Sequence, residues 1–403
     1  MKNSARIVVF LFSLIAILSV LVVWKKGDRA DALKALVSQF DADVSVSDGD
    51  FYVGCDSEKL EDLVAFAALM NRAGKPTILD LTGAPNLKSF KGIEKLTSLR
   101  SLIAIDCPSL VSAEGVSRHP SLYEIVLVDS ASFSDASAIQ GMPALEILDF
   151  SGCLSLESVE VSSLSALRDL FLSRCRKLEV LDVSSLKGLK QLYADGCGGL
   201  KKLTGLSSLT ELTDLDVGNA TSLERLEGIA SLSSLIVLDM RNVELDDLSE
   251  IGKLPTLRVL RMGGQSAITN LEPFSGLTSL REIHLEACPN FESLKGFPPG
   301  ISQYAGFTHC PKLMSLSGIE RGSAIEQLDL TGCENLSDVS AIGSLKKLSQ
   351  LNLVKCRSVR EVGFIETLPG LGVVMLGGSG VVPASTEKLE PANKAIILDF
   401  SVQ

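Results

Sequence analysis

Residues 145–203 decide the fold, and they read LEILDFSGCLSLESVEVSSLSA, LRDLFLSRCRKLEVLDVSSLKG and LKQLYADGCGGLKKL in succession. Each of these units has an apolar residue at its first, fourth and sixth positions, a cysteine at the ninth and a leucine at the twelfth. The units start 22 residues apart. A fixed period of this size is typical of a repeat array, in which each unit packs only against its neighbours.

The apolar residues of each unit alternate with variable ones, as Leu148 and Phe150 do in the first of them. This two-residue alternation predicts a short β-strand with one buried face. One unit is too small to bury that face alone, so successive units must stack. Stacking places equivalent strands side by side in a parallel sheet, about 4.8 Å apart.

The same scaffold continues from residue 76 to residue 403, with starts 22 or 23 residues apart and 24 before the last. This gives 14 full repeats and a terminal strand, which start at Pro76, Leu99, Leu122, Leu145, Leu167, Leu189, Leu212, Leu235, Leu257, Leu280, Ser302, Ile325, Leu348, Leu371 and Ala395. The segments between strands are short and rich in Ser and Gly, which favours extended or 3₁₀ structure over crossover helices. In the unit at 297–311, we expect Pro298 and Pro299 to loosen the sheet by removing ladder hydrogen bonds.

Eight of the nine cysteines fall at the turn after a strand, where leucine-rich repeat proteins carry Asn or Cys: Cys107, Cys153, Cys175, Cys197, Cys288, Cys310, Cys333 and Cys356. Residues 76–403 therefore resemble a leucine-rich repeat protein. The stretches NLSDVSAIGSLKKLSQLNL (335–353) and ITNLEPFSGLTSLREIHL (268–285) are similar to the short repeats of bacterial internalins. The resemblance implies an α/β-type repeat solenoid that is curved, with a parallel sheet on its concave face and short 3₁₀ or extended segments on its convex face.

The cysteines of this row are expected to be buried packing thiols, with a disulfide between adjacent repeats or a metal site as alternatives. Tetrahedral zinc needs four ligands that converge about 2.3 Å from one point, which a line of side chains does not supply. The three histidines, His119, His284 and His309, lie in different repeats and belong to no catalytic or metal motif. We therefore expect no catalytic residues, no cofactor, no metal and no enzymatic activity.

The N-terminal stretch IVVFLFSLIAILSVLVVW (7–24) has no charged residue in 18 positions, which is enough for a helix to span a bilayer. The apolar core of a cleaved signal peptide is usually shorter, at roughly 7–15 residues. We expect residues 1–26 to be a single-pass signal-anchor, with the repeat domain on the extracytoplasmic side. The alternatives are a cleaved signal, with Ala30-Asp31-Ala32 as the cleavage site, and a buried helix.

Residues 27–75 differ from the repeats that follow. Residues 27–49 are mixed: residues 31–40 fit a short amphipathic helix and residues 41–50 are polar and acidic, which together indicates a stalk or lead-in. Residues 51–55 then predict a strand and residues 57–71 a helix, with Ser57 as its N-cap. Terminal units of solenoids are atypical because they cover the exposed end of the core. Residues 50–75 are therefore expected to be an N-terminal strand-helix cap, and residues 76–403 the solenoid.

A ligand is expected on the face of the sheet that the variable strand residues form, because side chains alternate across a strand. The central repeats carry aromatic residues and charges of both signs on that face, a mixture that suits a protein partner. The candidate ligand-binding residues are Phe171, Tyr193, Asp195, Asp214, Asp216, Asp239, Arg241, Arg261, His284 and Glu286. The formal net charge of −11 argues against nucleic acid as a partner.

The expected function is that of a membrane-anchored binding module for a protein or peptide. The alternative is an envelope or surface scaffold that self-associates without a distinct ligand. The last strand, residues 395–400, has no helix or polar repeat after it in the sequence, and an open strand edge can pair with another chain. This C-terminal edge is therefore expected either to dock a partner or to form a homodimer.

Overall fold

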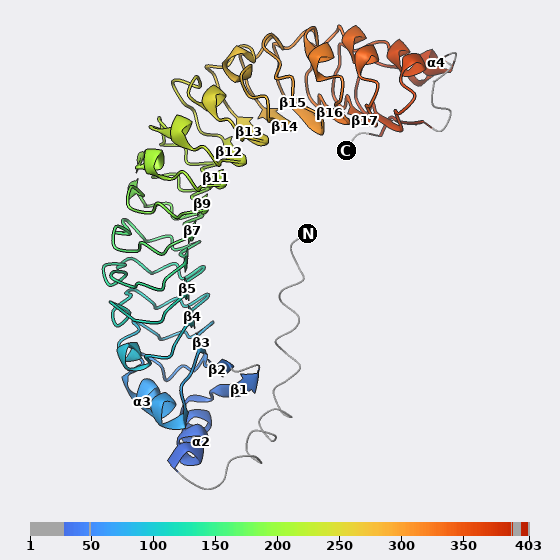
Figure 1. Cartoon of the computed structure of the whole chain (residues 1–403). Coiled ribbons are helices and arrows are strands. Elements are labelled where there is room, and N and C mark those ends of the chain that lie inside the picture. Colours follow the sequence, from blue (N-terminus) through green and yellow to red (C-terminus); the bar gives the residue numbers. More distant parts are fainter. Residues whose placement is uncertain (1–27, 48–49, 388, 390–395, 402–403) are drawn as a thin grey trace. The chain divides into compact units, whose positions relative to one another are not determined.

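A computed structural model describes residues 28–47, 50–387, 389 and 396–401. The chain divides into two compact units, Met1–Leu189 and Lys190–Gln403, and each is built on short parallel strands (Figure 1). The signal-anchor predicted over residues 1–26 lies outside the described residues. Among the helices that are described, none combines the length and the apolar character needed to cross a bilayer.

The parallel sheet of the first unit begins with β2 (Asp50–Gly54). Each later strand pairs in parallel with the one before it: β3 (Ile78–Asp80), β4 (Ser101–Ile103), β5 (Glu124–Val126), β6 (Ile147–Asp149) and β7 (Asp169–Phe171). A further short strand of this unit, β8 (Val180–Asp182), was not expected from the sequence.

The second unit repeats the arrangement over a longer stretch. Its parallel strands pair in chain order as β9 (Gln191–Tyr193), β11 (Asp214–Asp216), β12 (Val237–Arg241), β13 (Val259–Gly263), β14 (Glu282–Glu286), β15 (Tyr304–Thr308), β16 (Gln327–Asp329), β17 (Gln350–Asn352), β18 (Val373–Met375) and β19 (Ile397–Asp399). The short strand β10 (Lys202–Thr204) also belongs to this unit.

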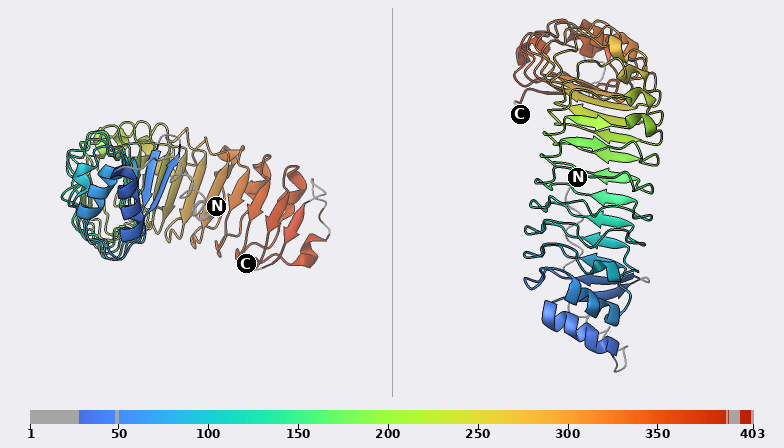
Figure 2. Two further views of the ribbon diagram at one scale, coloured as in Figure 1. Left: turned by 90° about the horizontal axis from the view of Figure 1, so that it is seen from below. Right: turned by 90° about the vertical axis from the view of Figure 1, so that its left-hand side faces the viewer.

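Alternation across each strand separates core from surface. The central residue, such as Leu192 in β9 or Leu215 in β11, is buried, and its two neighbours stay partly exposed. Figure 2 shows the strands of each unit side by side as successive rungs. The repeat solenoid with a parallel sheet that the period predicted is confirmed, because within each unit the paired strands from β3 on lie 22 to 24 residues apart.

The segments that connect successive strands are short, as expected. In the second unit the strands line the inner side of the curve and the 3₁₀ helices lie on its outer side (Figure 1). The 3₁₀ helices are η2 (Ile93–Lys95) in the first unit and η3 (Leu206–Ser208), η4 (Ile229–Ser231), η5 (Ile251–Lys253), η6 (Glu272–Phe274), η7 (Ile319–Gly322), η8 (Ser340–Ser344) and η9 (Gly363–Thr367) in the second. One four-residue α-helix, α4 (Pro383–Thr386), follows them.

The N-terminal cap includes more of the chain than the sequence indicated. The segment expected as a stalk or lead-in folds into α2 (Asp28–Phe40) and β1 (Asp43–Ser47), and β1 pairs antiparallel with β2. Helix α2 packs on α3 (Val64–Ala73), where the rings of Phe40 and Phe66 meet edge to face at 5.2 Å. Buried apolar side chains of α2, among them Leu33 and Leu36, help to cover the end of the core.

The helix of the cap begins later than expected. It starts at Val64, so the expectation of a helix over residues 57–71 with Ser57 as N-cap is wrong. Ser57 is buried, and its Oγ accepts a hydrogen bond from the Lys59 N–H at 3.3 Å in a turn before the helix. Asp62 instead accepts the Val64 N–H at 3.0 Å.

The prolines of the unit at 297–311 do not loosen the sheet, so this expectation is also wrong. Strand β15 pairs with β14 over five residues, from Tyr304 to Thr308. Pro298 and Pro299 precede the strand and lie in the connecting segment, where no ladder hydrogen bond is required of them.

In the turn that follows each of the strands β3 to β7, β9 and β11 to β18, one residue has a positive φ. These residues are Gly83, Asp106, Asp129, Gly152, Arg174, Gly196, Asn219, Asn242, Gly264, Ala287, His309, Gly332, Lys355 and Gly378. The cysteine row follows directly after this column. All nine cysteines are buried and none is in a disulfide. The Cys153 thiol donates to the Leu127 carbonyl at 3.2 Å and the Cys333 thiol to the Phe307 carbonyl at 2.8 Å, so they serve as packing groups of the turns.

Candidate functional site

The outward-facing side chains of β9 to β19, which we call the strand face, lie in register across the second unit. The third residues of these strands, which follow the buried central ones, form one line in which Tyr193 lies beside Asp216, Asp216 beside Asp239, Asp239 beside Arg261 and Arg261 beside His284. Nine of the ten candidate residues belong to this unit. Phe171 is in β7 of the first unit, so it is a separate candidate position.

Asp239 and Arg241 form a tight ion pair on β12 of the strand face. The Arg241 Nε donates to Asp239 Oδ1 at 3.0 Å, and its Nη2 donates to Oδ2 at 2.7 Å. Asp239 is only 4% exposed, although the alternation placed it on the solvent side. The guanidinium of Arg241, two residues later on the same face, covers it. Arg241 is therefore the accessible member of the pair, and Asp239 is the group that positions it.

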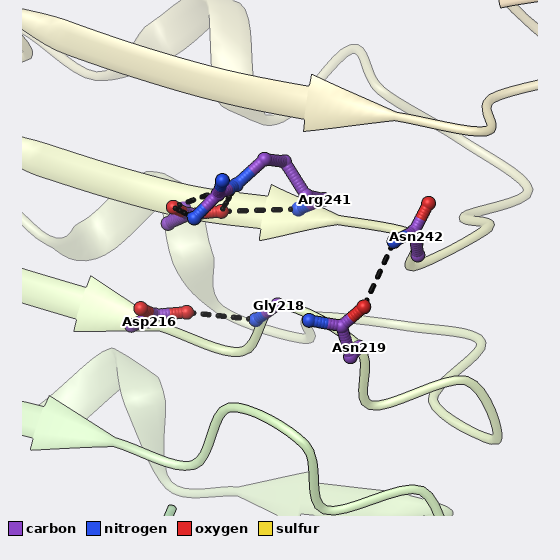
Figure 3. Close-up of polar contacts among 6 residues, drawn as sticks. Asp216, Gly218, Asn219, Arg241 and Asn242 are labelled. Atoms are coloured by element: carbon purple, nitrogen blue, oxygen red, sulfur yellow. Dashed lines mark hydrogen bonds and ion pairs between the residues drawn. The ribbon is translucent and has the colours of Figure 1, made fainter. Parts of the chain in front are cut away.

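Asp216 lies beside this pair in β11, and its environment is different. Its Oδ1 accepts the Gly218 N–H at 2.8 Å, as Figure 3 shows. Burial raises the pKa of this carboxyl to about 6, and the neighbouring charges of Asp239 and Asp195 add to the rise. The hydrogen bond from the Gly218 N–H and the charge of Arg241 lower this pKa. At neutral pH the group is ionised, and near pH 6 it takes up a proton.

Gly218 allows these two carboxylates to approach each other. A Cβ atom added at Gly218 would lie 3.1 Å from Asp216 Oδ1 and 3.3 Å from Asp239 Oδ1. The space that a side chain would fill is therefore occupied by acidic oxygens. The turns next to them are joined by Asn242, whose Nδ2 donates to Asn219 Oδ1 at 2.8 Å (Figure 3).

His284 stands at the other end of the line, in β14. Its ring stacks on that of Tyr304 with a centroid separation of 4.3 Å and an interplanar angle of 18°. The His284 Nε2 lies 3.3 Å from Glu282 Oε2. Burial lowers the pKa of the imidazole, and the charges of Arg261 and Arg241 lower it further, whereas Glu282 raises it. The ring is therefore mostly neutral at pH 7.

The remaining predicted residues line the same face with differing exposure. Glu286 and Arg241 are exposed, whereas Tyr193, Asp195, Asp214 and Arg261 are partly exposed. Asp214 Oδ2 accepts the Thr213 hydroxyl at 2.7 Å. The structure thus brings acidic, basic and aromatic groups together over β9 to β14, as the register of the repeats requires.

Two residues of this surface were not among the candidates, Tyr304 in β15 and Asp329 in β16. Tyr304 occupies a first strand position, but its ring lies against Gly306, where an added Cβ would be 2.6 Å from Tyr304 Cε1. Its hydroxyl donates to Asp329 Oδ2 at 3.5 Å. The spacing Tyr-x-Gly within a strand is the sequence signal that could have found it. The same spacing at Tyr52 and Gly54 leads the Tyr52 hydroxyl to Asp80 Oδ2 at 3.0 Å.

Clefts elsewhere in the second unit lie beside the 3₁₀ helices. One of about 620 Å³ adjoins η8 and η9, with Asp338, Arg360 and Phe364 in its wall. Another of about 470 Å³ adjoins η4 and η5, and five of its eleven lining residues are acidic. Across the part of the chain that the structure describes, no three or more His, Cys, Asp or Glu side chains are arranged to hold a metal ion.

The stacked repeats of 22 to 24 residues, the parallel sheet and the buried cysteine row define a leucine-rich repeat solenoid with short repeats. Solved structures of such proteins are similar to it. An internalin, InlF, of Listeria monocytogenes is 17% identical, with a TM-score of 0.56 over 81% of this chain and 87% of that one. A leucine-rich repeat protein of Leptospira interrogans is 19% identical, with a TM-score of 0.54 over 82% of this chain and 92% of that one.

The functional domain of Listeria monocytogenes InlJ is also similar. It is 18% identical, with a TM-score of 0.54 over 75% of this chain and 63% of that one, and it includes a cysteine ladder. The sequence matches no family model and none of the curated proteins. At identities of 17–19% these likenesses establish the fold, and the residues of the strand face have to carry the functional argument.

Proposed function

We propose that this chain is a non-enzymatic binding module that holds a protein or peptide partner on the strand face of its second unit. The proposed contact residues are Tyr193, Asp195, Asp214, Asp216, Arg241, Arg261, His284 and Glu286, with Asp239 beneath them. The similar solved structures are leucine-rich repeat proteins, among them internalins, which supports a binding role for the fold. Phe171, in the first unit, stays a separate predicted contact.

The Asp239–Arg241 pair is the observation that carries the proposal. A carboxylate that is 4% exposed adds little net stability, because its desolvation offsets most of its attraction to the guanidinium. The pair does, however, fix a half-exposed arginine in one orientation, with its side chain 49% accessible. Preorganised arginines and tyrosines are typical of the energetic centre of protein interfaces.

The proposal is tested by affinity capture with the full-length protein in detergent. Tyr193→Ala and Arg241→Gln should each reduce a captured partner at least tenfold, as truncating a central aromatic or arginine typically does. Tyr123→Ala is the matched control, since Tyr123 is 38% exposed but belongs to the first unit. Equal capture by the variants of the strand face and by the wild type would place the partner elsewhere.

We further propose that residues 1–26 anchor the chain in a membrane as a single-pass segment, with the repeats on the extracytoplasmic side. The uncharged 18-residue run at 7–24 supports this. The full chain should sediment with membranes, and a chain that lacks residues 1–26 should be released. A soluble full-length chain that retains Met1 would contradict the anchor.

Self-association through the last strand is the second candidate, and one observation favours it. Ile397 in β19 is 59% exposed, which is unusual for a large apolar side chain of this sheet. If β19 pairs with a second copy, Ile397→Lys should convert a dimer into a monomer in sedimentation of the detergent-solubilised chain. A wild-type monomer at high concentration would exclude this role.

A further inference from the structure

Tyr304 is held in one orientation by its own strand and by the next one. Gly306, two residues later, has no side chain, and the Tyr304 ring lies over it. The hydroxyl is fixed by Asp329 Oδ2 at 3.5 Å. Strand β15 pairs in full register with β14, which fixes the backbone on which the ring stands.

His284 holds the same ring from the side of β14. The two rings are nearly parallel, at 18° and 4.3 Å. Glu282 in turn fixes the imidazole through Nε2 at 3.3 Å. Tyr304 and His284 thus form a small rigid surface, which we call the aromatic pair, with a carboxylate at each end. The loss of side-chain entropy on binding is small for groups that are already fixed in this way.

The charges around the aromatic pair differ between its two sides. Burial raises the pKa of the Tyr304 hydroxyl, and the nearby charges of Asp329, Glu286 and Glu282 raise it further. Thr331 donates to Asp329 Oδ1, at 2.9 Å through its N–H and at 2.6 Å through its hydroxyl. The arginines of this region, Arg261 and Arg241, belong to β13 and β12 on the far side of His284. The side toward β15 and β16 is therefore negative.

We propose that the aromatic pair, with Asp329 and Glu286, is the subsite that receives a basic side chain, lysine or arginine, from the partner. The inference rests on the proposed function and specifies its chemistry. A cation near a tyrosine ring is attracted by the ring quadrupole, and a guanidinium also stacks on flat rings. The carboxylates add charge-assisted hydrogen bonds and repel an acidic side chain.

The probe for this subsite is a phage-displayed library of short linear peptides, selected on the full-length protein in detergent. Peptides are sorted by whether they lose binding to Tyr304→Ala. Those that do should share a lysine or arginine. Replacing that residue by glutamine should weaken binding to the wild type about tenfold, and should have little further effect on binding to Tyr304→Ala.

Variants that keep the fold separate the contact from a structural effect. Tyr304→Phe keeps the ring and should retain most of the binding, whereas Asp329→Asn should weaken the basic peptides by severalfold without unfolding the protein. Tyr52→Phe is the matched control, because Tyr52 has the same spacing to Gly54 and bonds Asp80 in the cap. Unchanged thermal unfolding of each variant is required before its binding is interpreted.

The outcomes distinguish this inference from the function on which it rests. Peptides that depend on Tyr193 or Arg241 but bind Tyr304→Ala normally would overturn the subsite and leave the binding function standing. Peptides that depend on Tyr304 but contain no basic residue would overturn the proposed chemistry. A selection in which no peptide responds to any variant of the strand face would overturn both.

Discussion

His119 is the clearest departure from the repeat pattern among single residues of the core. It is 2% exposed and occupies a position that Leu96 and Met142 hold in the neighbouring repeats. Its Nδ1 accepts the Leu122 N–H at 3.2 Å, and its Nε2 has no partner within hydrogen-bond geometry. Burial lowers the pKa of the imidazole, and a backbone interaction with Leu96 offsets this only in part. His119 is therefore a neutral histidine in an apolar column.

We expect His119→Leu to stabilise the protein by about 1–3 kcal/mol, because it removes an unsatisfied buried polar group. This gain in the free energy of unfolding should be larger at acidic pH. The unfolded chain binds a proton at His119 more readily than the folded one, so the wild type loses stability as the pH falls below about 6.5. Thermal unfolding at pH 7.5 and pH 5.5 measures both effects. The same pH dependence in the variant and the wild type would show that His119 does not titrate in this way.

The contribution of Asp216 to the stability of the fold should have the opposite pH dependence to that of His119. Its pKa in the folded state is raised to about 6, so the folded chain binds this proton more tightly than the unfolded one. The stability that this provides is complete in acid, below the unfolded pKa near 3.8, and is lost as the pH rises through 6. Asp216→Asn keeps an acceptor for the Gly218 N–H and should raise the melting temperature at pH 7.5 but not near pH 4. A lower melting temperature of the variant at pH 7.5 would contradict burial as the cause of the raised Asp216 pKa.

The candidate site shows how far single residues can be interpreted from the sequence. Alternation placed Tyr193, Asp216 and Arg261 on the outer face correctly, because that depends only on the strand period. It failed for Asp239, which is buried because Arg241 folds back over it. It also missed Tyr304, because the direction of its ring is set by the absent side chain of Gly306. Both cases depend on contacts between side chains, which a period does not specify.

At the scale of the repeat element, the turn after each strand carries the strongest local constraint. Gly152 has φ +79°, and a Cβ atom there would be 2.1 Å from Asp129 Oδ1. Asp129 passes over this glycine and accepts a hydrogen bond from Arg174 Nη2 at 2.8 Å, two repeats further along the chain. The glycine therefore makes room for an ion pair that joins the turns on either side of its own.

We expect Gly152→Ala to destabilise the protein by roughly 1–3 kcal/mol, through the left-handed backbone and the loss of this space. Gly363→Ala is the matched control, since a Cβ atom at Gly363 would meet nothing within 4 Å. Urea unfolding of both variants measures the difference. Equal stabilities would mean that the turn relaxes at little cost.

Among the elements, the 22- to 23-residue period predicts the buried cysteine row but not the structure of the N-terminal cap. The cysteine row was predictable because one position in each repeat faces the core, and the thiols are buried there. Its chemistry follows from that burial, which raises the pKa of Cys153 to about 12 and makes the thiolate scarce at neutral pH. The start of α3 and the pairing of β1 were not predictable, because the cap lies outside the repeat and is fixed by packing between α2 and α3.

At the scale of the molecule, the fold followed from a single observation, the 22- to 23-residue period. Repetition makes each unit dependent on its neighbours, and a parallel sheet is the arrangement that buries every strand. The function does not follow in the same way, because the repeats that build the core leave the outer positions free to vary. We therefore expect the outer positions of β9 to β16 to hold the partner, as proposed above.

Site-specific photo-cross-linking locates the face of the protein that the partner contacts. The photoreactive residue benzoylphenylalanine replaces Tyr193 on the strand face in one chain, and Lys253 in η5 in another, and both full-length proteins are irradiated in their native cells. Lys253 is the control, because its side chain is 61% exposed on the opposite side of the same unit. We expect one discrete adduct from position 193 and none from position 253. An adduct from position 253 alone, or equal adducts from both, would contradict this expectation.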